Sequence, residues 1–100
     1  MILEDIEKRI REKMLYAPPV RARVRFDFGD DGHLFIDGTQ DPPAISRDDA
    51  ESDTTLICTA QVFQAILDGT QDPNMAYLMG KLKVRGSLGL AMKLNAMLED

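Results

Sequence analysis

A chain of 100 residues, 44% hydrophobic and 29% charged, has room for one hydrophobic core, so we expect a single domain over residues 1–100. No apolar run approaches the roughly 18 residues of a membrane span, and the first residues lack a signal-peptide pattern, which together predict a cytoplasmic protein. A net charge of −5 argues against a nucleic-acid partner, because phosphate backbones are bound mainly by basic surfaces.

The charges are unevenly distributed along the chain. Residues 1–25 contain seven Lys or Arg and four acids, residues 26–80 one Arg and eleven acids, and residues 81–100 four cationic residues and two acids. Basic end segments that pack beside the acidic middle would form ion pairs, and exposed pairs stabilise by only ~0–1 kcal/mol each. Independently solvated faces are the open alternative.

The first quarter of the chain predicts a helix followed by a strand. Over residues 2–15 apolar side chains recur every three or four positions, which indicates an amphipathic helix ending before Pro18-Pro19. From Val20 to Phe28 apolar residues alternate with charged ones, the pattern of a half-buried strand. Residues 29–32, Gly-Asp-Asp-Gly, are typical of a tight turn, since glycine and aspartate tolerate positive φ.

Three more strands are predicted before the chain becomes helical. The second strand covers about residues 34–37, and after a polar loop over residues 38–43 Ile45 lies on a short edge strand. Residues 53–59 are rich in β-branched side chains and predict a further strand.

Capping residues mark two helices after this strand. Thr59 is a suitable N-cap, Gly69 a suitable stop, and the residues between them place four apolar side chains on one helical face: Val62, Phe63, Ile66 and Leu67. Asp72-Pro73 then begins a short apolar helix, with Pro at the favoured first position.

The last quarter predicts a strand and a helix. Residues 81–85 alternate, with cations on one face, and Gly86-Ser87 end the strand and cap the next helix. Residues 88–98 form that helix, whose apolar side chains cover more than one side and predict apolar neighbours on two sides. The order of elements predicts an α+β fold with helices gathered on one face of a sheet.

Catalytic and metal-binding patterns are missing from the sequence. His33, the only histidine, has no partnered nucleophile and is interpreted as a solvated turn residue, and Cys58 as a small buried apolar residue. Asp27-x-x-Asp30-Asp31 resembles the start of a calcium loop but lacks the Glu at its twelfth position. We therefore predict a protein that is not an enzyme, with no catalytic residue, no metal and no cofactor.

Soft apolar side chains are concentrated between Thr59 and Leu98, where four of the six methionines lie. Methionine repacks around varied partners, which suits a pocket for a flexible apolar ligand. A small methionine-rich core without a ligand fits the composition equally well.

Residues 75–94, which read MAYLMGKLKVRGSLGLAMKL, resemble the signature of the sterol carrier protein-2 family of lipid-transfer domains. In that family a Gly-Lys-Leu-Lys strand leads into a helix of the Leu-Ala-Met-x-Leu type. Upstream elements occur in the same order as in the family. They are the turn over residues 28–32, the strand at residues 53–55, and the helix that ends at Gly69 and is followed by Asp72-Pro73. The resemblance covers most of residues 20–98.

The resemblance implies a five-stranded, mostly antiparallel sheet covered on one face by helices, with an apolar tunnel between them. It implies non-enzymatic binding and transfer of a fatty acyl chain, phospholipid or isoprenoid; the alternative is an accessory protein for a lipid- or quinone-modifying enzyme. A transient membrane or enzyme partner is compatible with both, and the oligomeric state is open. By this resemblance the tunnel would be lined or gated by Phe63, Ile66, Met75, Leu78, Met79, Leu88 and Met92.

The short chain and the absence of a peroxisomal tail predict a compact bacterial member of the family. An empty, dry pocket of ~300 Å³ would destabilise the domain by about 7 kcal/mol, so a form without ligand is expected to be collapsed, open to water or occupied. The cations at Lys81, Lys83, Arg85 and Lys93 either meet a ligand head group or form a solvated face.

Overall fold

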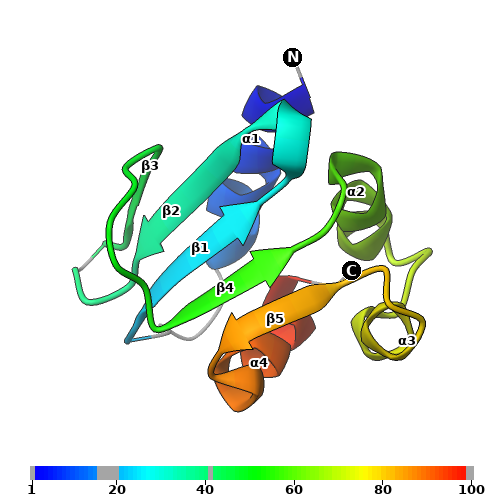
Figure 1. The fold of residues 1–100 in the computed structure, drawn as a ribbon. Coiled ribbons are helices and arrows are strands. Elements are labelled where there is room, and N and C mark those ends of the chain that lie inside the picture. The colour runs from blue at the N-terminus through cyan, green and yellow to red at the C-terminus, as the bar shows by residue number, and fades with distance from the viewer. Residues whose placement is uncertain (1, 16–20, 41, 99–100) are drawn as a thin grey trace.

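The computed structural model describes residues 2–15, 21–40 and 42–98, and its helices lie behind one face of a five-stranded sheet (Figure 1). The helices are α1 (Ile2–Met14), α2 (Ala60–Asp68), α3 (Pro73–Leu78) and α4 (Leu88–Leu98), with one 3-10 turn, η1 (Gly29–Asp31). The strands are β1 (Arg23–Asp27), β2 (His33–Asp37), β3 (Ala44–Ser46), β4 (Thr54–Ile57) and β5 (Lys83–Gly86).

The strands lie in the order β3-β2-β1-β4-β5. Strands β1 and β2 form an antiparallel hairpin through η1, where Gly29 and Gly32 have φ of 64° and 106°. Strand β4 pairs with β1 in parallel, and the other pairings are antiparallel. The predicted α+β class and mostly antiparallel sheet are therefore confirmed, and Ile45 lies on an edge strand as expected.

The predicted helix caps are confirmed in detail. The Thr59 side chain accepts a hydrogen bond from the Val62 amide at 3.1 Å, and Gly69 ends α2 with a φ of 80°. The Asp72 carboxylate accepts from the Asn74 amide at 3.1 Å before Pro73 opens α3. The predicted helix end at Pro18-Pro19 and the strand start at Val20 lie outside the described residues.

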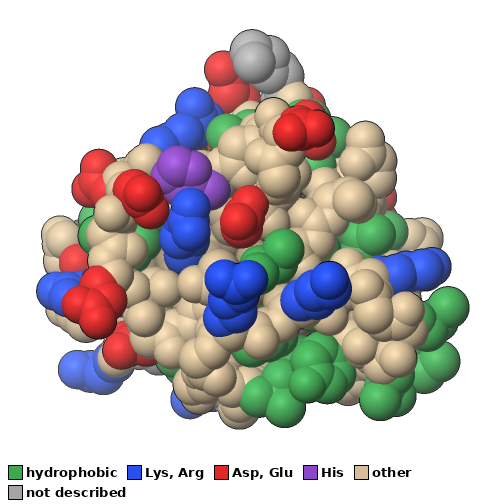
Figure 2. Space-filling model, viewed as in Figure 1, with side chains coloured by type: hydrophobic (Ala, Val, Ile, Leu, Met, Phe, Trp, Pro, Cys, Tyr) green, Lys and Arg blue, Asp and Glu red, His purple; other side chains and the backbone are tan. Residues whose placement is uncertain are grey.

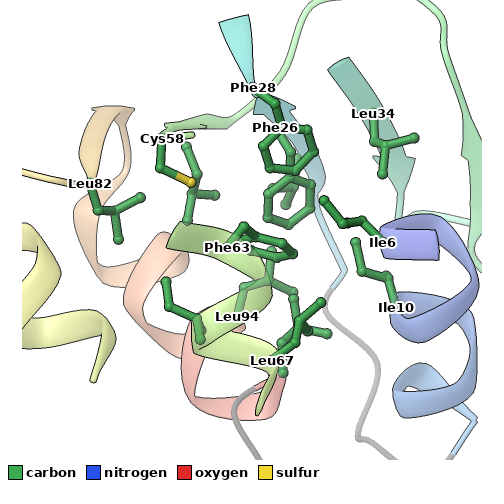
Figure 3. Packing of buried hydrophobic residues seen from close by; sticks show 14 of the residues in the cluster. Ile6, Ile10, Phe26, Phe28, Leu34, Cys58, Phe63, Leu67, Leu82 and Leu94 are labelled. Atoms are coloured by element: carbon green, nitrogen blue, oxygen red, sulfur yellow. The ribbon is translucent and has the colours of Figure 1, made fainter. Parts of the chain in front are cut away.

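The core forms between the helical layer and the apolar side of the sheet (Figure 3). Phe26 from β1 and Phe28, just after this strand, meet Phe63 from α2, with ring centroids 5.0 Å and 5.3 Å from that of Phe63. Helix α1 buries Leu3, Ile6 and Ile10 against this cluster. Helix α4 packs against α1, α2, α3 and the sheet, so the expectation of apolar neighbours on two sides is confirmed.

Ion pairs link the basic N-terminal segment to the acidic middle of the chain. Arg9 lies 2.6 Å from Asp68, and Arg25 lies 3.6 Å from Asp49. The predicted charge pairing is thus confirmed for the first segment. The interpretation of His33 as a solvated turn residue is wrong, because it begins β2 and its Nε2 lies 2.9 Å from the Arg47 carbonyl oxygen.

None of the helices in the described ranges has the length and hydropathy needed to span a bilayer.

Candidate functional site

Large apolar side chains are exposed at one end of the molecule, on α3, just after it and at the start of α4. Their relative exposures range from 39% to 75%, and we call them the apolar face: Met75, Tyr77, Leu78, Met79 and Leu88. Helix α3 has only six residues and buries only Pro73 and Ala76. A helix this short and this weakly buried presents most of its side chains to solvent, which makes the face an unusual feature for a small domain.

A groove of about 540 Å³ runs between α3 and β5, beside the apolar face. This α3–β5 groove is lined by Ile57, Tyr77, Leu78, Gly80, Leu82, Lys83, Val84 and Arg85. A neighbouring groove of about 480 Å³ shares Ile57, Gly80 and Lys83 with it and extends toward η1 and the start of α2. Both volumes fall within the range of small-ligand sites.

The structure divides the seven predicted lipid-binding residues into two groups. Phe63 and Ile66 have no exposed surface and lie in the core, and neither lines a groove described above. Met92 is half-buried against the core. The remaining residues, Met75, Leu78, Met79 and Leu88, are on the apolar face. The grooves at this end are open to the surface, so a shared apolar tunnel stays a prediction.

Several lining residues of the α3–β5 groove did not stand out in the sequence as site residues. Leu82 and Val84 were predicted only as the apolar side of a strand, and Ile57 only as part of one. The alternation over residues 81–85 predicted that Leu82 and Val84 share one side of β5, but the groove is also lined by Lys83 and Arg85. Tyr77 lies in the helix that the sequence predicted only as short and apolar.

Ionisable groups near the grooves offer no reactive nucleophile. Burial, and to a smaller extent the negative charge of Asp27, raise the pKa of the Cys58 thiol to about 12. The thiol is therefore neutral at physiological pH and unsuited to nucleophilic attack. Within the described ranges, no three or more His, Cys, Asp or Glu side chains are grouped to hold a metal ion.

Asn95 is a polar residue on the buried, apolar side of α4. Its side chain is buried, and neither amide atom has a hydrogen-bond partner among the described residues. Ala91, Leu94 and Leu98 lie on the same buried side of the helix. A buried amide without partners is destabilising, since it has lost its hydrogen bonds to water.

We expect Asn95→Leu to raise the free energy of unfolding by about 1–2 kcal/mol, because it removes the unpaired amide and adds apolar contacts. Urea denaturation of the purified chain measures this change. Asn95→Asp serves as the opposite control and is expected to destabilise, since it buries a carboxyl group. Unchanged or lower stability of Asn95→Leu would contradict the prediction and indicate that a buried water satisfies the amide.

Together these features define an α+β domain whose helical layer leaves an apolar face and groove at one end. The family model of the SCP-2 sterol transfer family matches residues 3–99. The chain therefore belongs to the SCP-2 sterol transfer family, as its C-terminal motif predicted.

Two curated relatives illustrate the match. Human sterol carrier protein 2 is 38% identical over 50 residues, which are 50% of this chain and 9% of the human protein. The chain thus corresponds to a small part of that relative. The non-specific lipid-transfer protein-like 1 of Caenorhabditis elegans is 29% identical over 104 residues, covering 99% of this chain and 88% of the worm protein.

Solved structures share the fold. Sterol carrier protein 2 like 2 from Aedes aegypti has a TM-score of 0.78 at 22% identity, covering 96% of this chain and 95% of that one. The Aedes aegypti sterol carrier protein-2 complex with palmitate has a TM-score of 0.76 at 17% identity, with 99% and 98% covered. A ubiquinone synthesis protein, UbiJ-SCP2, has a TM-score of 0.68 at 18% identity, with 95% and 86% covered.

Proposed function

We propose that residues 1–100 form one non-enzymatic domain that binds and transfers a lipid with a fatty acyl or isoprenoid chain. The observation that carries the proposal is the apolar face beside the α3–β5 groove. Exposed apolar surface of this kind marks ligand or interaction sites in stable proteins. Membership of the SCP-2 family supports a lipid ligand, and so does the palmitate in the Aedes aegypti complex.

The lipid chain would lie between α3, α4 and β5. Met75, Leu78, Met79 and Leu88 would contact it at the entrance, with Met92 beside them. Phe63 and Ile66, which are buried in the core, would form the inner wall once the helical layer opens to admit the chain. The closed core and open groove fit a form without ligand, in which an empty pocket of ~300 Å³ would be costly.

Several features support a carrier without chemistry of its own. The Cys58 thiol is protonated by virtue of its raised pKa, and the His33 ring contacts a backbone carbonyl rather than a nucleophile. A general-base mechanism needs a nucleophile within hydrogen-bond reach of a base. The contact of His33 with a backbone carbonyl does not supply one. We propose the cytoplasm as the location, and a bacterial source stays a prediction.

The alternative function is that of an accessory protein for a lipid- or quinone-modifying enzyme. The likeness in fold to the ubiquinone synthesis protein favours this possibility. In that case the apolar face would contact the enzyme, and the chain would bind little ligand of its own.

Native mass spectrometry of the freshly purified chain, followed by lipid extraction, tests the proposed function first. A bound lipid, or saturable uptake of a fluorescent fatty acid, is expected if the chain is a carrier. An apo mass together with no uptake of fatty acids or phospholipids would reject the carrier and favour the accessory role.

A matched pair of leucine variants tests whether the apolar face takes the ligand. Leu78 and Leu15 are both 75% exposed, but Leu15 directly follows α1 and lines a different groove, with Pro42, Pro43 and Ile45. We expect Leu78→Ser to weaken binding of the fluorescent fatty acid about tenfold, since it removes one apolar contact made only in the complex. Leu15→Ser is expected to bind as the unchanged chain does. Equal affinities of the two variants would contradict a site on the apolar face.

A further inference from the structure

Strand β5 is the last strand of the sheet and pairs with β4 on one side only. Its other edge borders the α3–β5 groove, which is lined by four consecutive residues, from Leu82 just before the strand to Arg85 within it. Successive side chains of a strand point to opposite faces of the sheet, so a groove that touches all four runs along the edge rather than across one face. The groove therefore lies where a further strand would pair.

Backbone groups of β5 are directed toward this edge. The Ser87 amide donates a hydrogen bond to the Asp53 carbonyl oxygen at 3.2 Å, directly after the strand. Bonded and non-bonded pairs alternate along an antiparallel ladder, so in the observed register Lys83 and Arg85 bond to β4. Val84, between them, then directs its N–H and C=O away from β4. Within the described ranges, no backbone hydrogen bond outside the sheet involves Val84, which leaves these groups available to an added strand.

The side chains along this edge form a charged row beside an apolar one. Figure 2 shows Lys and Arg side chains over β5, with hydrophobic side chains below and to the right of them, over α3 and the start of α4. Lys83 and Arg85 are exposed on one face of the strand, whereas Val84 is half-buried on the other, near Leu78 in the same groove. Each face of the edge therefore favours a different kind of side chain.

The charge of this edge is not neutralised within the chain. Residues 73–98 contain four cationic residues and no acidic one, whereas the whole chain has a net charge of −5. Among the described residues, no ion pair involves Lys83 or Arg85, while Arg9 and Arg25 of the N-terminal segment each pair with an acid. An external anionic group can therefore pair with the β5 cations without displacing an internal one.

We propose that the free edge of β5 binds an extended acidic segment of a partner protein as an additional strand. In such strand addition the main-chain hydrogen bonds supply affinity and alternate side chains supply specificity. One set of alternate side chains would face Lys83 and Arg85 and is therefore acidic, because opposite charges at facing positions are stabilising. The other set would lie beside Val84 and Leu78 and is therefore apolar. The edge thus selects a segment in which Asp or Glu alternates with apolar residues.

A second copy of the chain fits this edge poorly. Pairing β5 with itself would place Lys and Arg side chains opposite one another on the same face, where like charges repel. The opposite edge of the sheet is also less suitable, since β3 has three residues and its Ile45 carbonyl oxygen already accepts from the Arg11 guanidinium at 3.4 Å. Strand addition at β5 goes beyond the proposed function and does not depend on it, because a chain that takes up no lipid could still bind this segment.

Fluorescence anisotropy with labelled peptides and the full chain tests the proposal. The probe is a nine-residue peptide in which Glu alternates with Val, and we expect saturable binding. One control peptide has the same residues with all Glu before all Val, and another has Lys in place of Glu. We expect both controls to bind at least roughly tenfold more weakly, because the first loses the alternation and the second is repelled by the β5 cations.

Backbone methylation of the peptide distinguishes strand addition from simple charge attraction. N-methyl groups on the Val residues remove the donors along one edge of the extended peptide, and N-methyl groups on the Glu residues remove those along the other. Only one edge of an added strand pairs with β5, so we expect one methylated peptide to lose binding and the other to keep it. Retention of binding by both would overturn the proposal.

A pair of double variants tests the β5 cations. Lys83→Gln with Arg85→Gln is expected to weaken binding of the alternating peptide by roughly tenfold or more. Lys8→Gln with Arg11→Gln on α1 removes the same charge and is expected to change binding little. Circular dichroism and thermal melting establish that both variants are folded, and uptake of the fluorescent fatty acid is measured in parallel. A β5 variant that keeps this uptake while losing the peptide separates the edge from the lipid site and supports the proposal.

Three further results would overturn strand addition at β5. The first is equal binding of the alternating peptide and the control in which all Glu precede all Val. The second is equal loss in the two double variants. The third is a dimer, detected by sedimentation equilibrium, that excludes the alternating peptide, because it would assign the edge to a second copy of the chain.

Discussion

Replacing Phe63 by alanine is expected to lower the free energy of unfolding by about 3–5 kcal/mol, the usual cost of deleting a buried ring. Phe63 has no exposed surface and contacts both Phe26 and Phe28. The cavity left between α2 and β1 cannot be filled by small movements, since rigid sheet lies on one side of it. Urea denaturation followed by circular dichroism measures the change.

Tyr77→Ala is the matched aromatic control. This ring is 39% exposed on the apolar face, so we expect its loss to change stability by less than about 1 kcal/mol. Equal and small effects of the two substitutions would contradict a packing role for Phe63 and favour a ring that lines a ligand cavity. The large effect that we expect means that ligand binding by Phe63→Ala must be compared at equal fractions of folded protein.

Local signals in the sequence were sufficient for most of the fold. Thr59, Gly69 and Asp72-Pro73 occupy the cap positions that their chemistry favours, so the boundaries of α2 and the start of α3 could be predicted. The alternation around Phe26 fixed which side of β1 faces the helices. Pairing between distant strands has no such local signal, which is why the parallel contact of β1 with β4 did not follow from the pattern.

The sequence predicted that apolar residues form the candidate site, but not which of these residues are buried and which are exposed. Ile66 and Leu78 are both apolar residues in short helices, and periodicity alone does not distinguish them. The difference arises in three dimensions, because α2 packs between α1 and α4 whereas α3 contacts mainly α4. Ile66 is consequently in the core and Leu78 is exposed. The family resemblance named both as lipid-binding residues, and the ligand experiments described above decide that question.

The second large effect is expected from Gly86→Ala, at the end of β5. Gly86 has a φ of 91°, which is strained for any residue with a Cβ, and that Cβ would lie 2.5 Å from the Asp53 carbonyl oxygen. The same oxygen accepts a hydrogen bond from the Ser87 amide at 3.2 Å. The Thr54 hydroxyl donates a hydrogen bond to the carbonyl oxygen of either Ser87 or Arg85. Relief of the contact must therefore move β5 or the start of α4. We expect a loss of about 3 kcal/mol or more in the free energy of unfolding.

Gly89→Ala, three residues further on, distinguishes this close contact from a general effect of losing glycine. A Cβ at Gly89 would meet nothing within 4 Å, and the position lies in α4. Alanine there is expected to raise stability by about 0.5–1 kcal/mol, because glycine is a poor helix former. Thermal melts of the two variants should thus move in opposite directions. Unchanged or higher stability of Gly86→Ala would contradict the close approach of β5 to Asp53.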